Sequence, residues 1–181
     1  DIRKKFKKIT WKKSEFNPGG NIVKLNSIET KNSKNITTED FFCNEEIIIE
    51  TSFSVIKSGF QVSCLLEFYS NNRLIFQTFD DYINAEWGKQ KNYELGDYKS
   101  ICKIPKNFFN LGIVDINIVI FTPPGSYHDS FQVSYPTKSI GAISFNVIDI
   151  ETFDKSSGSY PFNLNKDAII NPRVDHKIKK I

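Results

Sequence analysis

Alternation of apolar and polar side chains recurs along most of the chain, and it limits the fold more than any other feature. In the run 113–121, for example, apolar residues at every even position alternate with Asp115 and Asn117. A period of two places successive side chains on opposite faces of a strand. The runs are also rich in β-branched and aromatic residues, which favour strands over short buried helices. The sequence therefore predicts an all-β protein.

Seven runs of this kind are predicted as strands, at residues 21–30, 46–56, 61–69, 73–79, 98–104, 113–121 and 142–148. Ser70, Asn71 and Asn72 form a hairpin-type turn between the third and fourth runs, and Pro105 ends the fifth. About seven to eight strands at this spacing are typical of an antiparallel, immunoglobulin-like β-sandwich.

Two connections are too long to be hairpin loops, and both contain aromatic residues. The connection 79–97 includes Trp87, and the connection 122–139 includes Tyr127. Long loops on a rigid sandwich often carry binding function. The alternative is that these aromatic side chains fold back over the ends of the sandwich.

The net charge of +3 is unevenly distributed along the 181 residues. Residues 1–20 hold seven basic and two acidic side chains, and residues 171–181 hold four and one, so the body between them is acidic. A nucleic-acid-binding module places positive charge on its folded body, where the charge can follow the phosphates. The distribution therefore disfavours nucleic acid as a partner.

The chain lacks the motifs of the common catalytic and cofactor sites. It has no Gly-rich phosphate-binding loop, no dinucleotide fingerprint, no nucleophile elbow and no H-E-x-x-H pair, and it contains only two histidines. Asp80 and Asp81 with Glu86 are candidates for the paired carboxylates of a glycoside hydrolase, although a solvated loop is the simpler interpretation. We therefore expect neither catalysis nor a metal or cofactor in this chain.

The three cysteines, Cys43, Cys64 and Cys102, form no C-x-x-C pair, and their number is odd. We interpret them as small buried side chains of a protein from a reducing, cytosolic compartment. No apolar run approaches the ~20 residues of a bilayer-spanning helix, and no signal-peptide pattern opens the chain. Because the chain contains no methionine, we expect it to be part of a longer protein.

Three segments, in order along the chain, resemble one bacterial family. Residues 95–112 resemble a signature of the form G-x-Y followed by I-P and L-N-x-G, through Gly96, Tyr98, Pro105 and Gly112. Residues 11–21 resemble the connector that precedes this module in the family. Residues 168–175 resemble its closing strand, although Ala168, Asn171 and His176 depart from the usual glycine, arginine and tryptophan. The family is that of the C-terminal carbohydrate-binding domains of the ATP-binding subunits of O-antigen and related polysaccharide ABC transporters (Wzt type).

The resemblance implies a function in recognition and no catalysis. Such a domain binds the finished polysaccharide, near its non-reducing end, for ATP-driven export across the inner membrane through the channel subunit of the transporter. ATP and Mg would belong to an ATPase domain upstream, at the cytoplasmic face of that membrane. The resemblance further implies a linker at 1–20, the sandwich at 21–150, and a linker with a terminal strand, exchanged in a homodimer, at 151–181. A membrane-surface contact is an alternative role for the basic stretch 3–13.

On this interpretation the sugar lies on a polar sheet face. Hydroxyl-rich ligands suit planar polar side chains combined with an aromatic surface. The alternation places suitable residues on one face, with two loop aromatics at its edge, and the candidate carbohydrate-binding residues are Glu67, Tyr69, Arg73, Gln77, Trp87, Asp115, Asn117, Tyr127 and Asn146. Three alternatives stay open: an ordinary solvated sheet face, a β-sandwich that serves only protein–protein interaction, and a carbohydrate-active enzyme using Asp80 or Asp81.

Overall fold

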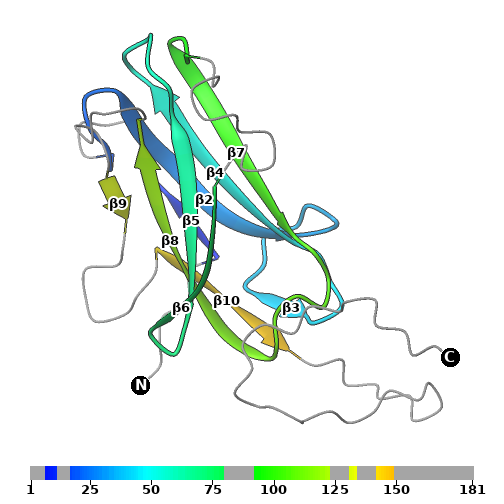
Figure 1. Ribbon diagram of the computed structural model, residues 1–181. Coiled ribbons are helices and arrows are strands. Elements are labelled where there is room, and N and C mark those ends of the chain that lie inside the picture. The colour runs from blue at the N-terminus through cyan, green and yellow to red at the C-terminus, as the bar shows by residue number, and fades with distance from the viewer. Residues whose placement is uncertain (1–6, 12–16, 80–91, 123–130, 134–141, 149–181) are drawn as a thin grey trace, which may run out of the picture.

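The computed structural model describes residues 7–11, 17–79, 92–122, 131–133 and 142–148. These residues form strands and connecting turns, with no helix among them, so the all-β prediction is confirmed (Figure 1). The strands are β1 (Lys8–Thr10), β2 (Val23–Asn32), β3 (Asp40–Phe42), β4 (Ile47–Val55), β5 (Ser63–Ser70), β6 (Arg73–Phe79), β7 (Gly96–Ile104), β8 (Gly112–Phe121), β9 (Phe131–Val133) and β10 (Ile143–Ile148).

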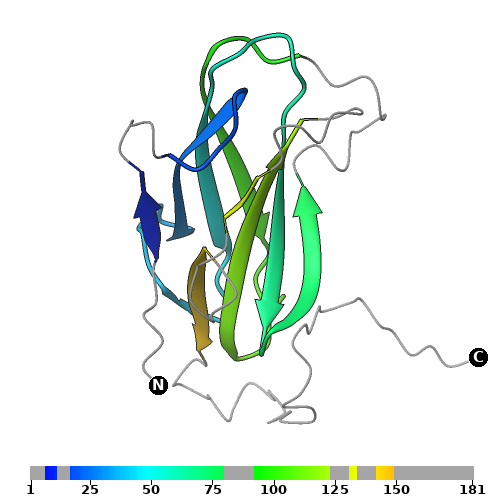
Figure 2. The same ribbon diagram turned by 90° about the vertical axis from the view of Figure 1, so that its left-hand side faces the viewer.

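The strands form two sheets that pack face to face. The first sheet has the order β1-β2-β4-β7, and the second has the order β3-β10-β8-β5-β6, with β9 also paired to β8. All neighbours are antiparallel except β10 and β3, which run parallel. In Figure 2, β1 and β2 (blue) lie on one side of the molecule and β5 and β6 (green) on the other. This is a β-sandwich, as predicted.

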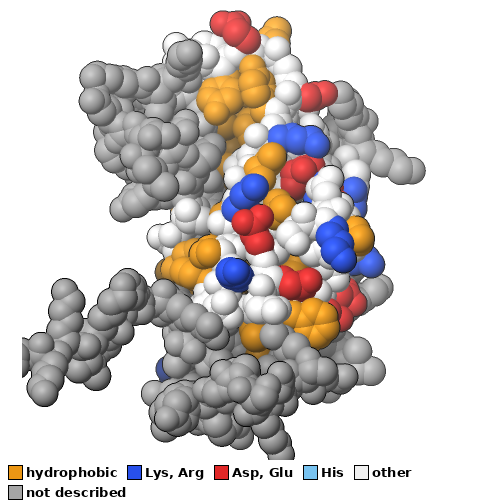
Figure 3. Space-filling view, turned by 90° about the vertical axis from the view of Figure 1, so that its right-hand side faces the viewer, with side chains coloured by type: hydrophobic (Ala, Val, Ile, Leu, Met, Phe, Trp, Pro, Cys, Tyr) orange, Lys and Arg blue, Asp and Glu red, His pale blue; other side chains and the backbone are white. Residues whose placement is uncertain are grey.

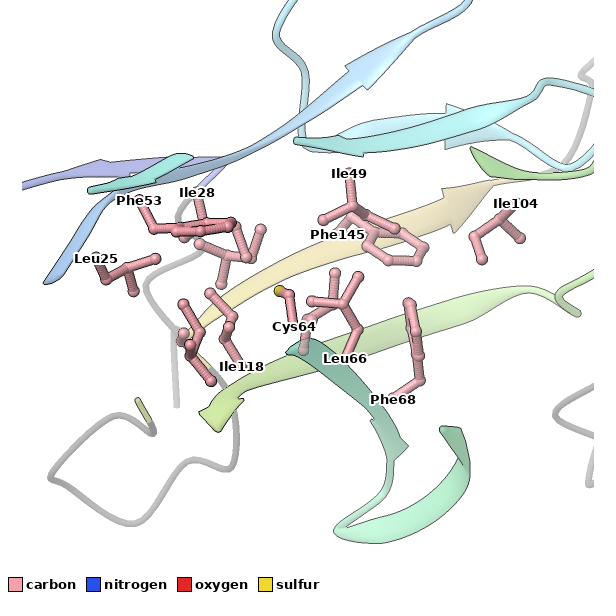
Figure 4. Packing of buried hydrophobic residues seen from close by; sticks show 14 of the residues in the cluster. Leu25, Ile28, Ile49, Phe53, Cys64, Leu66, Phe68, Ile104, Ile118 and Phe145 are labelled. Carbon is pink, nitrogen blue, oxygen red and sulfur yellow. The ribbon is translucent and has the colours of Figure 1, made fainter. Parts of the chain in front are cut away.

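The apolar halves of the alternating runs meet between the two sheets. Ile28 and Phe53 point inward from the first sheet, and Leu66, Phe68 and Phe145 point toward them from the second (Figure 4). All five side chains are at least 97% removed from solvent. Fully burying a side chain of this size stabilises a fold by about 1.5–3 kcal/mol. The packing of the sheets therefore follows directly from the alternation in the sequence.

All seven predicted strands are present, with ends that agree or differ by at most two residues. Three short strands, β1, β3 and β9, were not predicted, because a strand of three residues is too short to show alternation. β1 lies within the predicted linker 1–20 and pairs with β2, where Lys8 is opposite Glu29. This part of the predicted linker is therefore built into the first sheet.

Trp87 and Tyr127 lie outside the described residues, as do the predicted linker and terminal strand 151–181. Of the cysteines, Cys64 is buried while Cys43 and Cys102 are half-buried, and all three are free thiols. The described part of the chain contains no helix long and apolar enough to span a bilayer.

Candidate functional site

Three adjacent strands bring polar side chains together on the outer face of the second sheet. On β5, Glu67 lies directly opposite Gln77 of β6 on one side and Asn117 of β8 on the other. The three side chains form one row across the sheet. Tyr69, two residues along β5, faces the same way because side chains alternate along a strand. We call Glu67, Tyr69, Gln77 and Asn117 the Glu67 cluster.

Hydrogen bonds to the Glu67 carboxylate hold this cluster together. Gln77 Nε2 donates to Glu67 Oε1 at 2.9 Å, and Tyr69 OH donates to Glu67 Oε2 at 3.0 Å. Asn117 Nδ2 also donates to Glu67 Oε2, at 3.4 Å. A carboxylate has about four acceptor sites on its two oxygens. Glu67 therefore orients three neighbours at once.

The electrostatics of Tyr69 keep its hydroxyl protonated. Burial raises the pKa of Tyr69, and the hydrogen bond to the negatively charged Glu67 raises it further. The phenol therefore remains a donor to Glu67 across the physiological pH range.

Burial divides the predicted site residues into two groups. Gln77 is exposed and Glu67 and Tyr69 are half-buried, whereas Asp115 and Asn117 are only 5% and 3% exposed. The prediction that Asp115 and Asn117 are exposed is therefore wrong. Both lie on β8, which has paired strands on both sides, β5 on one and β10 and β9 on the other. Neighbours on both sides cover side chains of a central strand more completely than those near an edge.

Arg73 does not lie with Tyr69, although unbroken alternation predicts that it does. The pairing of β5 with β6 shifts register between Phe68 and Tyr69, so Tyr69 is opposite Leu74 and Ser70 is opposite Arg73. An extra residue in one strand exchanges the two faces beyond the bulge. An exposed apolar side chain, Leu74, therefore lies beside Tyr69 where the sequence predicts a guanidinium.

Asn146 is separated from the Glu67 cluster by its position on β10. It lies opposite Ile113 of β8, and its Nδ2 donates to Asp40 Oδ1 of β3 at 3.2 Å. The structure thus brings Glu67, Tyr69, Gln77 and Asn117 into contact, while Asn146 is bound at the β3 side of the sheet. Leu74 and Asp40 were not predicted as site residues. Only the strand pairing places Leu74 beside Tyr69 and Asp40 beside Asn146.

The outer face of the first sheet has a different character. Figure 3 shows the side of the molecule that carries β7, where basic and acidic side chains are interspersed with apolar ones. Lys31 lies between two carboxylates, with its Nζ 3.1 Å from Glu29 Oε1 and 3.0 Å from Glu50 Oε2. Lys8 and Lys99 extend these pairs to β1 and β7 at 3.2 and 2.8 Å. Ion pairs therefore link β1, β2, β4 and β7 on this face.

The fold and the Glu67 cluster define a class: a two-sheet β-sandwich with a hydrogen-bonded polar group on the outer face of one sheet. Among solved structures, the chain is similar to the one described as "Crystal structure of the C-terminal domain of wzt". The superposition has a TM-score of 0.54 at 11% sequence identity and covers 78% of this chain and 88% of that chain. No protein-family model and no curated protein matches the sequence. The chain therefore has the fold of the Wzt C-terminal domain, as the resemblance of its motifs implied.

Proposed function

We propose that this chain is the polysaccharide-recognition module of an ABC exporter and that it binds glycan on the outer face of β6, β5 and β8. The observation that carries the proposal is the Glu67 cluster, a preorganised row of carboxylate, amide and phenol groups. The likeness of the fold to the Wzt C-terminal domain supports the class of ligand.

The accessible part of the cluster suits a hydroxyl-rich ligand. The Glu67 carboxylate accepts hydrogen bonds, the exposed Gln77 amide both donates and accepts, and each sugar hydroxyl can do both. Leu74, 49% exposed beside Tyr69, offers an apolar contact for the C–H side of a sugar ring. Asn117 and Asp115, being buried, support this surface from β8 and contact the ligand less directly.

The expected affinity is modest. Each hydrogen bond exchanges water for protein at a net gain of about 1 kcal/mol, so a few bonds to one chain end give micromolar or weaker binding. Two sites in a homodimer raise the effective affinity for a long polymer. In the exporter, the domain binds the finished polysaccharide near its non-reducing end, on the cytoplasmic side of the inner membrane, and delivers it to the channel subunit.

Calorimetry with the polysaccharide of the source bacterium tests the proposal. We expect Gln77→Ala to weaken binding about three- to tenfold, because it removes about 1 kcal/mol of hydrogen bonding from an exposed position. Glu67→Gln should weaken it further, since an amide loses acceptor capacity and charge. Lys103→Ala, an exposed change on the outer face of the other sheet, is the control and should bind as the wild type.

Two further variants test Trp87 and Arg73. The sequence predicted both as site residues, but neither belongs to the Glu67 cluster. Trp87→Ala should weaken binding if the loop aromatics form the edge of the site, whereas Arg73→Ala should not, because the bulge moves it off this face. Normal binding by folded Gln77→Ala and Glu67→Gln would contradict the assigned face. Absence of glycan binding together with tight binding to another protein would favour a protein-interaction module.

A further inference from the structure

A pocket lies on the opposite sheet from the Glu67 cluster. It opens on the outer face of the first sheet, where β2, β4 and β7 lie side by side, and has a volume of about 360 Å³. This volume falls within the range of about 300–1,000 Å³ that is common for small-molecule sites. Its lining includes Asn17, Lys24, Asn26, Ser54, Ile56 and Asp97.

Strand register brings three of these residues together. Lys24 of β2 lies opposite Ser54 of β4, and Ser54 lies opposite Asp97 of β7. A cation, a hydroxyl and a carboxylate therefore form one row across three strands, although they are far apart in the sequence. All three residues lie within strands paired in one sheet, so the backbone ladder fixes their relative positions, as a preorganised site requires.

A β-bulge adds a fourth polar group to the row. The pairing of β2 with β4 shifts register between Leu25 and Ser27, so Asn26 is the extra residue. Bulges commonly redirect a side chain at functional positions. Here Asn26 Nδ2 donates to Ser54 Oγ at 2.7 Å, which shows that its amide reaches the row.

The hydrogen bonds run in one direction. Asn17 Nδ2 donates to Asn26 Oδ1 at 3.4 Å, Asn26 donates to Ser54, and Ser54 Oγ donates to Asp97 Oδ1. Asn17 is 6% exposed and anchors the chain at its buried end. Asp97 is the exposed, accepting end. The relay therefore presents a negative acceptor to the pocket with its orientation already set.

Donors and an apolar surface complete the lining. The second N–H of the Asn26 amide and the Lys24 ammonium, whose Nζ lies 3.4 Å from the Gly19 carbonyl oxygen, supply donors. Ile56 is 49% exposed at the pocket and supplies an apolar contact. The pocket thus combines acceptors and donors with an apolar surface. A matching ligand has adjacent hydroxyls, each of which can donate and accept a hydrogen bond, and C–H groups that contact the apolar surface.

We infer that this pocket binds a vicinal diol of a sugar or similar polyol. One hydroxyl donates to Asp97, the neighbouring hydroxyl accepts from Asn26 or Lys24, and the ring carbons pack on Ile56. The site is separate from the proposed glycan face because the two lie on different sheets of the sandwich. A free polyol and one sugar unit within a longer glycan have the same chemistry here, and the experiment separates them.

Backbone chemical-shift mapping on the whole 181-residue chain tests the inference. The probes are myo-inositol, which carries vicinal hydroxyls, and cyclohexanol, which has a similar ring with one hydroxyl. We expect inositol to shift the amides of Ser54, Gly96 and Asp97 saturably and cyclohexanol to leave them unchanged. Saturable shifts with an oligosaccharide and not with inositol would equally support the pocket and would identify the ligand as a sugar within a chain.

Matched variants complete the test. Asp97→Asn should weaken binding at these amides about tenfold, because it removes a charged acceptor, and Ser54→Ala should weaken it by releasing Asp97 from the relay. Ser52→Ala, one row along the same face of β4, is the control and should leave the affinity unchanged. Gln77→Ala, on the other sheet, should also leave it unchanged, which separates this site from the glycan face. The inference is overturned if neither probe class gives saturable shifts at these amides, or if folded Asp97→Asn binds as tightly as the wild type.

Discussion

Among single residues, Glu67 illustrates how one carboxylate organises a surface. It accepts hydrogen bonds from Tyr69, Gln77 and Asn117, which come from three strands. Because each donor is itself held by a hydrogen-bonded strand, the group loses little further conformational freedom when a ligand binds. The same side chain placed in a loop would need to be ordered on binding.

Cys102 provides a prediction at this scale. Burial raises the pKa of its thiol to about 11. Since the thiolate is the reactive form, only about one molecule in a thousand is reactive at Cys102 at pH 8. We expect iodoacetamide to modify Cys102 about 100-fold more slowly in the native protein than in denaturant. Site-resolved mass spectrometry over a time course measures both rates, and equal rates would show that the native thiol is not protected.

At the scale of elements, the four strands of the first sheet are joined on their outer face by charge. Glu29 of β2 lies directly opposite Glu50 of β4, a pairing of like charges that by itself destabilises a sheet. Lys31 contacts both carboxylates, and it is only 12% exposed. The lysine therefore converts a repulsive strand pair into an attractive one.

These contacts determine how stability depends on pH. For Glu29, burial opposes ionisation, but hydrogen bonds from Thr37, Lys31 and Lys8 outweigh it and lower the pKa. For Glu50, the hydrogen bond from Lys99 is the main cause of a lowered pKa, with Lys31 adding to it against the effect of burial. A lowered folded-state pKa contributes stability above the ordinary value of 4.5, and this stability is lost as pH falls through the folded values.

Lys31→Met tests this arrangement. The substitution leaves two nearly buried carboxylates facing each other, so we expect a loss of about 2 kcal/mol in the free energy of unfolding at pH 7. The difference between variant and wild type should shrink toward pH 3, because protonation removes the repulsion. Urea denaturation at several pH values measures this. A difference that stays constant with pH would mean that the effect comes from packing of the lysine stem and not from charge.

At the scale of the whole molecule, the sandwich separates two surfaces. The Glu67 cluster lies outside the second sheet and the Lys24–Ser54–Asp97 row outside the first, with the apolar core between them. Mutations at distant sites that share no partner usually have additive effects. Variants of the two surfaces should therefore act independently, as the two binding experiments require.

We predict that the chain forms a homodimer by exchange of its terminal segment. The resemblance to the Wzt family implies this exchange, and in the sequence a polar segment that contains Gly and Ser, 149–167, precedes the β-like run 168–174. A short strand on a flexible tether is exchanged between copies at low cost. Light scattering should give twice the chain mass of 20.9 kDa, and deletion of 168–181 should give monomer or insoluble protein. A stable, folded monomer at high concentration would contradict this prediction.

Much of the fold could be predicted from the sequence because alternation is a local property. The spacing of apolar residues along β4, β5 and β8 determines which side chains enter the core, and this needs no knowledge of the neighbouring strand. The shared face of Glu67, Tyr69, Asp115 and Asn117 follows from the same local rule. The hairpin turn is equally local, because its own residues, Ser70, Asn71 and Asn72, favour it.

Other features of the site depend on which strands pair and in what register, and only the tertiary structure determines these. The bulge opposite Phe68 and Tyr69 replaced Arg73 by Leu74 beside the cluster, and the central place of β8 buried Asp115 and Asn117. The row that joins Lys24, Ser54 and Asp97 likewise exists only because β2, β4 and β7 are neighbours. Register, and how completely an outward-facing side chain is covered, are set by contacts between residues distant in sequence. A periodic pattern within one strand does not determine them.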